Sequence, residues 1–361
     1  MATADTPPPD GFPRWATPPS APSAPRRPRT RHWATCFFGG LTLWTATVLV
    51  TYWTGNSNLL PTIVLLGSFL VPASFVIWAH ERYAADIGTD RIITCFAVGG
   101  IIGVLGASLL EYYLLKDDVW LYAGVGLIEE AAKAAALILV TRRIPGSGLR
   151  HGLVLGATVG FGFAAFETAG YAFNAVLTES GLSLRDLVST EILRGVLAPV
   201  GHGLWTAILG GVLFRERRND RFVINGPVVL TYLGVSALHA FWDSTHGLAA
   251  WLVARLTGEG QRVVLFNPAF RADPSEYQVE LFSVLSTSGL VLASVLGLFW
   301  LQLLIRSARR AGHRTGPQWP PTAPGPSTTA ASSTAAASST TSGRTAAPGP
   351  PLDPTGMLPP C

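Results

Sequence analysis

Seven ionisable side chains lie inside stretches of sequence that are otherwise apolar. The first three fall within the run "GLIEEAAKAAALILV" and the others follow at wide intervals; in order they are Glu129, Glu130, Lys133, Glu167, His202, His239 and Asp243. A charged group at the centre of a bilayer costs about 2.5–3.5 kcal/mol on insertion scales, so its default interpretation is a functional one. Acids and imidazoles of this kind serve as general bases, metal ligands or proton carriers.

The spacing of these groups places them on shared helix faces. Glu129 and Lys133 are four residues apart, and so are His239 and Asp243, so each pair would lie on one face of a helix. The adjacent carboxylates of Glu129 and Glu130 cannot both ionise cheaply, so one must be held neutral or meet a cation. Lys133 is the simplest candidate for that cation.

The elements that must carry these groups are predicted to be membrane-spanning helices. Hydrophobic residues make up 48% of the 361-residue chain and charged residues only 13%, about half the charged share of a soluble domain. A helix needs about 20 apolar residues to cross a bilayer. Eight windows qualify, at roughly 33–53, 59–80, 91–115, 119–141, 151–177, 193–214, 225–254 and 281–305. We therefore predict an all-α, polytopic membrane protein with about eight transmembrane helices.

Composition divides the chain into three parts. Residues 1–32 are rich in Pro, Ala and Arg, and residues 311–361 are rich in Ser, Thr, Ala and Pro. Neither segment can bury enough apolar surface to offset the entropy of ordering, so both tails are predicted to be disordered. Residues 33–310 are predicted to form a single transmembrane domain.

Arginines gather in alternate connections between the predicted helices. They occur before the first helix, between the fourth and fifth, between the sixth and seventh, and after the eighth. The positive-inside rule then places the chain in the cell membrane with both termini in the cytoplasm. The net charge of +4 is small, so we expect no nucleic-acid partner.

The predicted helices bring several of these groups to a similar depth. With odd-numbered helices running outward, each lies about nine to eleven residues from the outer end of its helix, or roughly 15 Å. The four are Glu130, Glu167, His202 and Asp243. We expect them to surround one polar cavity that water can reach. Glu111 and Arg194 fall at outer helix ends, where contact with solvent explains them.

Three glycines at four-residue spacing mark the fifth window. Gly152, Gly156 and Gly160 would form a small-residue stripe along one helix face. Such stripes let membrane helices approach closely. We therefore predict that the helix carrying Glu167 packs tightly against a neighbour.

Taken in chain order, the motifs are "EEAAK" from Glu129, "FAAFE" ending at Glu167, "HGLWT" from His202 and "HAFWD" from His239. This order resembles the PrsW family of intramembrane proteases, whose signature is EExxK, FxxxE and HxxxD on successive membrane helices. That family is grouped with CAAX-prenyl endopeptidases and bacteriocin-processing enzymes. The likeness covers about residues 90–255. It implies an endopeptidase that cuts a membrane-anchored protein, such as an anti-sigma factor, within the lipid bilayer.

The resemblance also implies roles for the motif residues. Glu129 or Glu130 would be the base that activates water, and Lys133 would hold the pair in register. The remaining residues would orient that water, bind a metal or stabilise the oxyanion; they are Glu167, His202, His239 and Asp243.

The cofactor is left open at this point. His202, His239 and Glu167 could supply three protein ligands to Zn²⁺ and leave a fourth position for water. A metal-free mechanism, in which a glutamate alone activates the water, uses the same residues.

Two other functions are compatible with a buried polar cluster. A proton-coupled transporter could relay protons through the same acids and histidines. Transporters commonly show internal repeats and broken helices; the chain has no convincing repeat, although Pro72 and Pro199 could break helices. A non-catalytic scaffold is the third option, but interhelical polar contacts of about 0.6 kcal/mol each offset little of the burial cost.

Overall fold

The computed structural model describes residues 31–144, 148–179, 181–257 and 274–314, and these residues are mainly helical. In chain order the helices are α1 (His32–Thr54), η1 (Ser57–Leu59), α2 (Leu60–Tyr83), α3 (Thr89–Thr94), η2 (Cys95–Gly99), α4 (Gly100–Leu114), α5 (Leu121–Thr141), α6 (Leu149–Val176), α7 (Leu184–Leu197), η3 (Ala198–Val200), α8 (His202–Arg215), α9 (Gly226–Leu256) and α10 (Glu276–Arg314). Two short strands, β1 (Leu177–Thr178) and β2 (Gly181–Leu182), pair antiparallel between α6 and α7. The predicted all-α fold is confirmed. The predicted disordered tails lie almost wholly outside the described residues.

Each predicted membrane window contains a helix. Six described segments are long and apolar enough to cross a membrane: His32–Thr54, Ser57–Tyr83, Thr89–Leu114, Leu149–Val176, Leu184–Arg215 and Glu276–Arg310. The other two windows hold α5 and α9, of 21 and 31 residues, which carry several of the charged candidate residues. The chain is a multi-pass membrane protein, and crossing by α5 and α9 remains a prediction.

Local signals set the ends of several helices. The side chain of Ser183 accepts a hydrogen bond from the backbone N–H of Asp186 at the start of α7, and that of Asn225 accepts one from Val228 at the start of α9. Both are N-caps, which satisfy amide groups that lack an intrahelical partner. Gly55 ends α1 with a left-handed φ of 64°, a conformation that glycine adopts without strain.

The sixth predicted window is interrupted. It begins at Leu184 rather than near residue 193, and a 3₁₀ turn at Ala198–Val200 divides it into α7 and α8. Pro199 lies in this turn. It explains the break, because proline cannot donate the backbone hydrogen bond that would continue the helix. Pro72, in contrast, lies within α2, which runs on without a break. The interruption ends immediately before His202, the first residue of α8.

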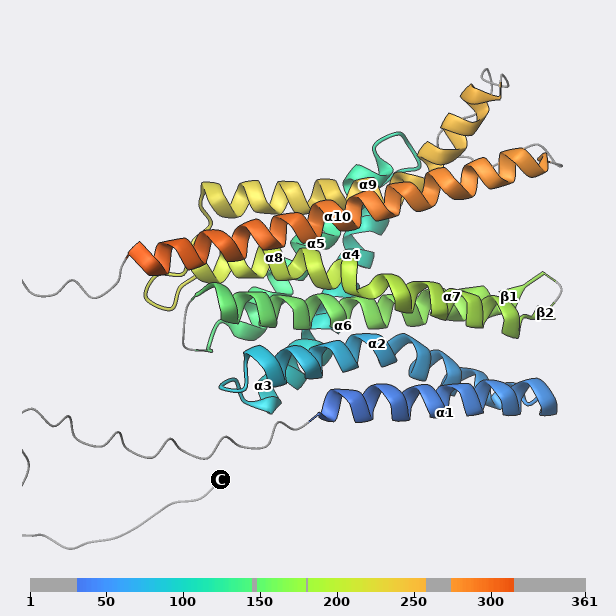
Figure 1. Ribbon diagram of the computed structural model, residues 1–361, viewed down its shortest axis with the longest axis horizontal. Coiled ribbons are helices and arrows are strands. Elements are labelled where there is room, and N and C mark those ends of the chain that lie inside the picture. The colour runs from blue at the N-terminus through green and yellow to red at the C-terminus, as the bar shows by residue number, and fades with distance from the viewer. Residues whose placement is uncertain (1–30, 145–147, 180, 258–273, 315–361) are drawn as a thin grey trace, which may run out of the picture. The chain divides into compact units, whose positions relative to one another are not determined.

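The predicted tight packing of the fifth window is confirmed as the contact between α6 and α8. A Cβ added at Gly152, Gly156 or Gly160 would collide with backbone carbonyl groups of α8, including that of His202. Figure 1 shows α6 between α8 on one side and α2 on the other. Large buried side chains, among them Trp205 and Phe161, fill the core around this contact.

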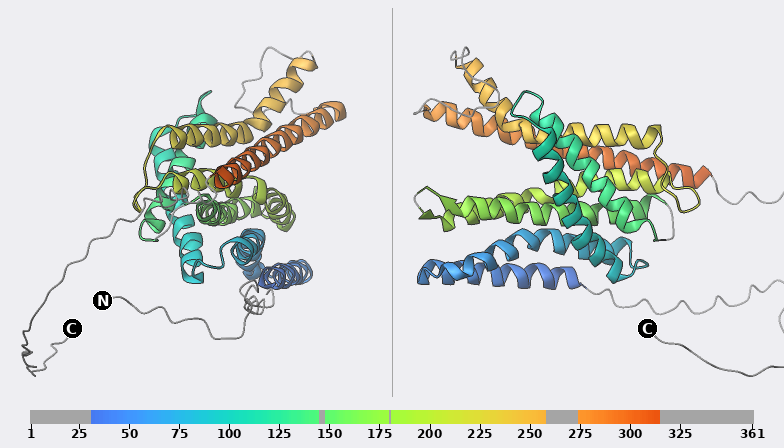
Figure 2. Two further views of the ribbon diagram at one scale, coloured as in Figure 1. Left: turned by 60° about the vertical axis from the view of Figure 1, so that its left-hand side comes forward. Right: turned by 180° about the vertical axis from the view of Figure 1, so that it is seen from behind.

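The helices α4 and α5 run obliquely across α6 and α8 (Figure 2). α5 packs against α9, where Gly126 lies against the backbone of Ser236 and Ala240. α4 packs against both α5 and α6, with Gly103 beside the ring of Phe163. These contacts bring α5, α6, α8 and α9 together around one buried region.

Candidate active site

The ammonium group of Lys133 is the centre of this buried region. Its Nζ lies 2.9 Å from Oε2 of Glu129 and 2.8 Å from Oε1 of Glu130, both on the same helix. The same nitrogen lies 2.7 Å from Nδ1 of His202 on α8. Lys133 is 0% exposed, and the ring of Phe163 lies beside it with its centroid 4.1 Å from Nζ. The contact between Lys133 and His202 therefore joins α5 to α8.

His239 reaches both acids of α5 from α9. Its Nδ1 lies 3.1 Å from Oε1 of Glu130, while its Nε2 lies 3.7 Å from Oε2 of Glu129 and 3.3 Å from Oδ2 of Asp243. Its side chain is 1% exposed, and its ring lies 4.7 Å from that of Trp205 between centroids. These contacts hold the imidazole in a defined orientation, with a carboxylate near each nitrogen.

Glu167 stands on the opposite side of His202 from the α5 acids. Its Oε2 lies 3.0 Å from Nε2 of His202 and contacts Nη2 of Arg194 at 2.6 Å. Nε of Arg194 also donates to Oγ1 of Thr168 at 2.9 Å. Glu167 thus connects α6 to both α7 and α8.

Arg194 and Thr168 are the site neighbours that sequence reasoning missed. Contact with solvent at a helix end was the expected role of Arg194, but its side chain is only 25% exposed and forms the ion pair with Glu167. An arginine within an apolar segment was a visible signal. A window that begins at residue 193 places this arginine at a helix end, whereas the helix begins at Leu184.

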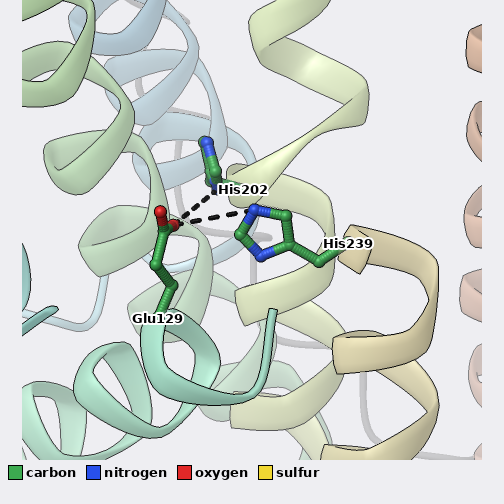
Figure 3. A group of neighbouring side chains, drawn as sticks. All are labelled: Glu129, His202 and His239. Carbon is green, nitrogen blue, oxygen red and sulfur yellow. Dashed lines mark ion pairs between the residues drawn. The ribbon is translucent and has the colours of Figure 1, made fainter. Parts of the chain in front are cut away.

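Three residues present ligand atoms that all lie within 4.8 Å of one another: Glu129, His202 and His239. Figure 3 shows the carboxylate of Glu129 directed toward the two imidazoles. Its Oε2 lies 3.9 Å from Nδ1 of His202 and 3.7 Å from Nε2 of His239. Two ligands of a tetrahedral zinc ion lie about 3.4 Å apart, given bonds of about 2.1 Å. These two separations are therefore close to those of a zinc site.

The second nitrogen of each imidazole also fits a metal centre. Nε2 of His202 contacts Glu167, and Nδ1 of His239 contacts Glu130. Histidines that bind a metal usually donate their other N–H to a carboxylate, carbonyl or water, which fixes the tautomer and the ring orientation. The donor types are those that Zn²⁺ uses, with Glu129 facing both imidazoles and Glu167 behind one of them. A bound ion would take the place that the Lys133 ammonium holds at Oε2 of Glu129 and Nδ1 of His202.

A small cavity of about 60 Å³ adjoins His202. It is bounded by α6, α7, α8 and α9 through Ala164, Thr168, Arg194, Leu197, Ala198, Gly201, His202 and Trp242. On the same measure of volume one water molecule needs about 10–15 Å³, so a cavity of this size has room for water. The break between α7 and α8 forms part of its wall, since Ala198 and Gly201 belong to that break.

This arrangement has the groups that amide hydrolysis requires. It combines buried carboxylates that can accept a proton, imidazoles and cations that can stabilise negative charge, and room for water. The low dielectric of the interior strengthens each of these charge interactions relative to bulk water.

A protein-family model described as "PrsW family intramembrane metalloprotease" matches residues 89–272, about half of the chain. The matched range runs from α3 through α9 and includes all seven predicted site residues. No curated protein and no solved structure matches the chain. Because the family model covers this much of the sequence, together with every motif, the chain belongs to the PrsW family of intramembrane metalloproteases.

Proposed function

We propose that this intramembrane protease uses Glu130 to activate water and Glu129, His202 and His239 to bind Zn²⁺. The observation that carries the proposal is the convergence of those three ligand atoms within 4.8 Å in the buried region. Membership of a protease family favours peptide hydrolysis over the proton-transport alternative.

The charge balance of the site supports a bound dication. Four carboxylates surround the two histidines, those of Glu129, Glu130, Glu167 and Asp243, whereas the cations in contact with them are Lys133 and Arg194. When all are ionised and the histidines are neutral, two negative charges remain. Uncompensated charge is costly in a buried site, and a divalent ion would neutralise it. When bound, the ion would act as a Lewis acid and lower the pKa of its water.

Glu130 has the free atom that a general base needs. Its Oε1 contacts Lys133 and His239, whereas Oε2 is buried and has no hydrogen-bond partner among the described residues. A buried carboxylate oxygen without a partner is costly, and a substrate water would satisfy it. In the proposed reaction Oε2 accepts a proton as the water oxygen bonds to the carbonyl carbon. The proton then passes to the amine as the C–N bond breaks, which gives a carboxylic acid and an amine.

The substrate of this protease is a membrane protein, because the site lies in a membrane-embedded helical domain. We propose a membrane-anchored anti-sigma factor as the natural substrate, following the motif resemblance. The arginine distribution supports an orientation with both chain termini in the cytoplasm. The membrane domain predicted at 33–310 is proposed to be flanked by cytoplasmic segments at both ends.

The test separates metal binding from proton transfer. The chain is co-expressed with a single-pass anti-sigma factor from its own host, and substrate fragments are followed for wild type, Glu129→Gln and Glu130→Gln. We expect both variants to lose cleavage, but only Glu129→Gln to lose zinc from the purified protein. His246→Ala serves as a control on α9, because the His246 ring contacts Phe282 of α10, at 5.9 Å between centroids. Undiminished cleavage by Glu130→Gln would show that another group activates the water.

A further inference from the structure

Arg194 makes contacts with two consecutive residues of α6. Its Nη2 lies 2.6 Å from Oε2 of Glu167, and its Nε lies 2.9 Å from Oγ1 of Thr168. Its guanidinium carbon also lies 4.2 Å from the ring centroid of Tyr171, one turn further along α6. A planar guanidinium directs its donors in fixed directions, so these contacts together define the position of the Glu167 carboxylate.

The carboxylate that Arg194 holds determines which nitrogen of His202 bears hydrogen. An ionised carboxylate only accepts hydrogen bonds, so Nε2 of His202, 3.0 Å from Oε2 of Glu167, must be the donor. On the other side of the ring, the Lys133 ammonium only donates, so Nδ1, 2.7 Å away, must be the acceptor. Both neighbours require the same neutral tautomer, with an unprotonated Nδ1 facing Glu129.

The attachment of α7 to the rest of the protein does not depend on this ion pair alone. Three residues before Arg194, the buried carboxylate of Glu191 accepts a hydrogen bond from Nε1 of Trp44 in α1 at 2.7 Å. The same carboxylate packs against Gly67 of α2. Thus α7 has an anchor on α1 and α2, and Arg194 has a separate contact with the acid behind His202.

We infer that Arg194 is a positioning residue, which acts through Glu167 to keep Nδ1 of His202 unprotonated, so that its lone pair can pass from the Lys133 hydrogen bond to a zinc ion. The inference rests on the proposed function, in which His202 is a metal ligand. Arg194 itself contacts neither the three ligand atoms nor the base Glu130. Its removal leaves the Glu167 carboxylate without its arginine partner and without a fixed position beside Nε2 of His202.

The experiment uses the full-length protein purified in detergent, with zinc affinity measured by competition against a chelator. Removing an outer partner of a metal-binding histidine typically weakens metal binding or activity about 10–100-fold. We expect zinc affinity to fall by this factor for Arg194→Gln and to recover in part for Arg194→Lys. Lysine restores the positive charge but not the two directed hydrogen bonds to Glu167 and Thr168. Glu191→Gln, three residues away on α7, can still accept from Trp44 and should bind zinc as wild type does.

A double-mutant cycle shows whether Arg194 acts through Glu167. In a Glu167→Gln background, Arg194→Gln should reduce zinc affinity or cleavage rate little further, because the ionised Glu167 carboxylate that links Arg194 to His202 is already missing. Wild-type affinity in a folded Arg194→Gln protein, or fully additive losses in the cycle, would overturn the inference while leaving the proposed function intact. If the wild-type protein neither binds zinc nor cleaves, the proposed function fails, and this inference fails with it.

Discussion

Nζ of Lys133 lies 2.7 Å from Nδ1 of His202 and within 2.9 Å of one oxygen from each of Glu129 and Glu130. An ammonium has three hydrogens, and these three acceptors use all of them. Lys133 therefore has no donor left for a substrate in this arrangement, and its part is to hold the two acids and the imidazole together.

Replacement of Lys133 by methionine should destabilise the protein. Removing one partner of a buried ion pair leaves uncompensated charge and costs about 3–5 kcal/mol. Thermal unfolding of the purified protein in detergent measures the effect. The chain has one other lysine, Lys116, which is exposed and provides the matched control Lys116→Met. Equal unfolding temperatures for the two variants would contradict the structural role of Lys133.

Alanine at either His202 or His239 should abolish stoichiometric zinc binding. Each change removes a proposed ligand. The loss of zinc affinity should therefore exceed a factor of about 10–100, which is typical when a residue that only contacts a metal-binding histidine is removed. Metal analysis of protein purified without chelator measures the content, and treatment of wild type with chelator should stop cleavage. Retention of one zinc ion per chain by both variants would exclude this ligand set.

The glycine stripe of α6 offers a packing test with an internal control. Gly156→Ala should destabilise the protein by about 1–3 kcal/mol, because the added methyl group meets the backbone of Thr206 and forces α6 away from α8. Gly170 lies on the same helix with nothing within 4 Å of an added Cβ, so Gly170→Ala should be neutral or slightly stabilising. Unfolding temperatures that rank the variants in the reverse order would disprove the close approach.

The carboxylate of Asp86, in the loop between α2 and α3, gives a pH prediction. Hydrogen bonds from Arg150 and His151 lower the pKa of Asp86 well below its usual value of 3.8. A lowered pKa in the folded state means that the contribution to stability is full above about pH 4 and is lost as the pH falls further. Asp86→Asn should therefore unfold at a lower temperature than wild type at pH 7, by an amount that shrinks at acidic pH.

The effect of Asp86→Asn should be modest, because the side chains of Asp86 and Arg150 are 49% and 56% exposed and water screens their charges. Added salt should reduce it further. Asp117→Asn, at another exposed aspartate outside the described helices, is the control. A difference between Asp86→Asn and wild type that grows as the pH falls would refute the assigned direction.

Most of the helices and the chemical groups of the site can be predicted from the sequence alone. Apolar windows reveal helices because a membrane helix satisfies its own backbone hydrogen bonds, so the signal is contained within about 20 residues. The acids, lysine and histidines of the site are visible for a related reason. A charged side chain in an apolar segment is costly, and it stands out in the sequence without knowledge of its partners.

Which of these groups meet, and through which atoms, depends on how the helices pack. This packing places Glu129 facing both imidazoles, puts Glu167 behind His202, and pairs Glu167 with Arg194 from α7. Those contacts depend on the close approach of α6 and α8 and on the break before His202. Contacts between residues 27 to 109 positions apart arise from the packing of whole helices, and no local pattern in the chain encodes their distances.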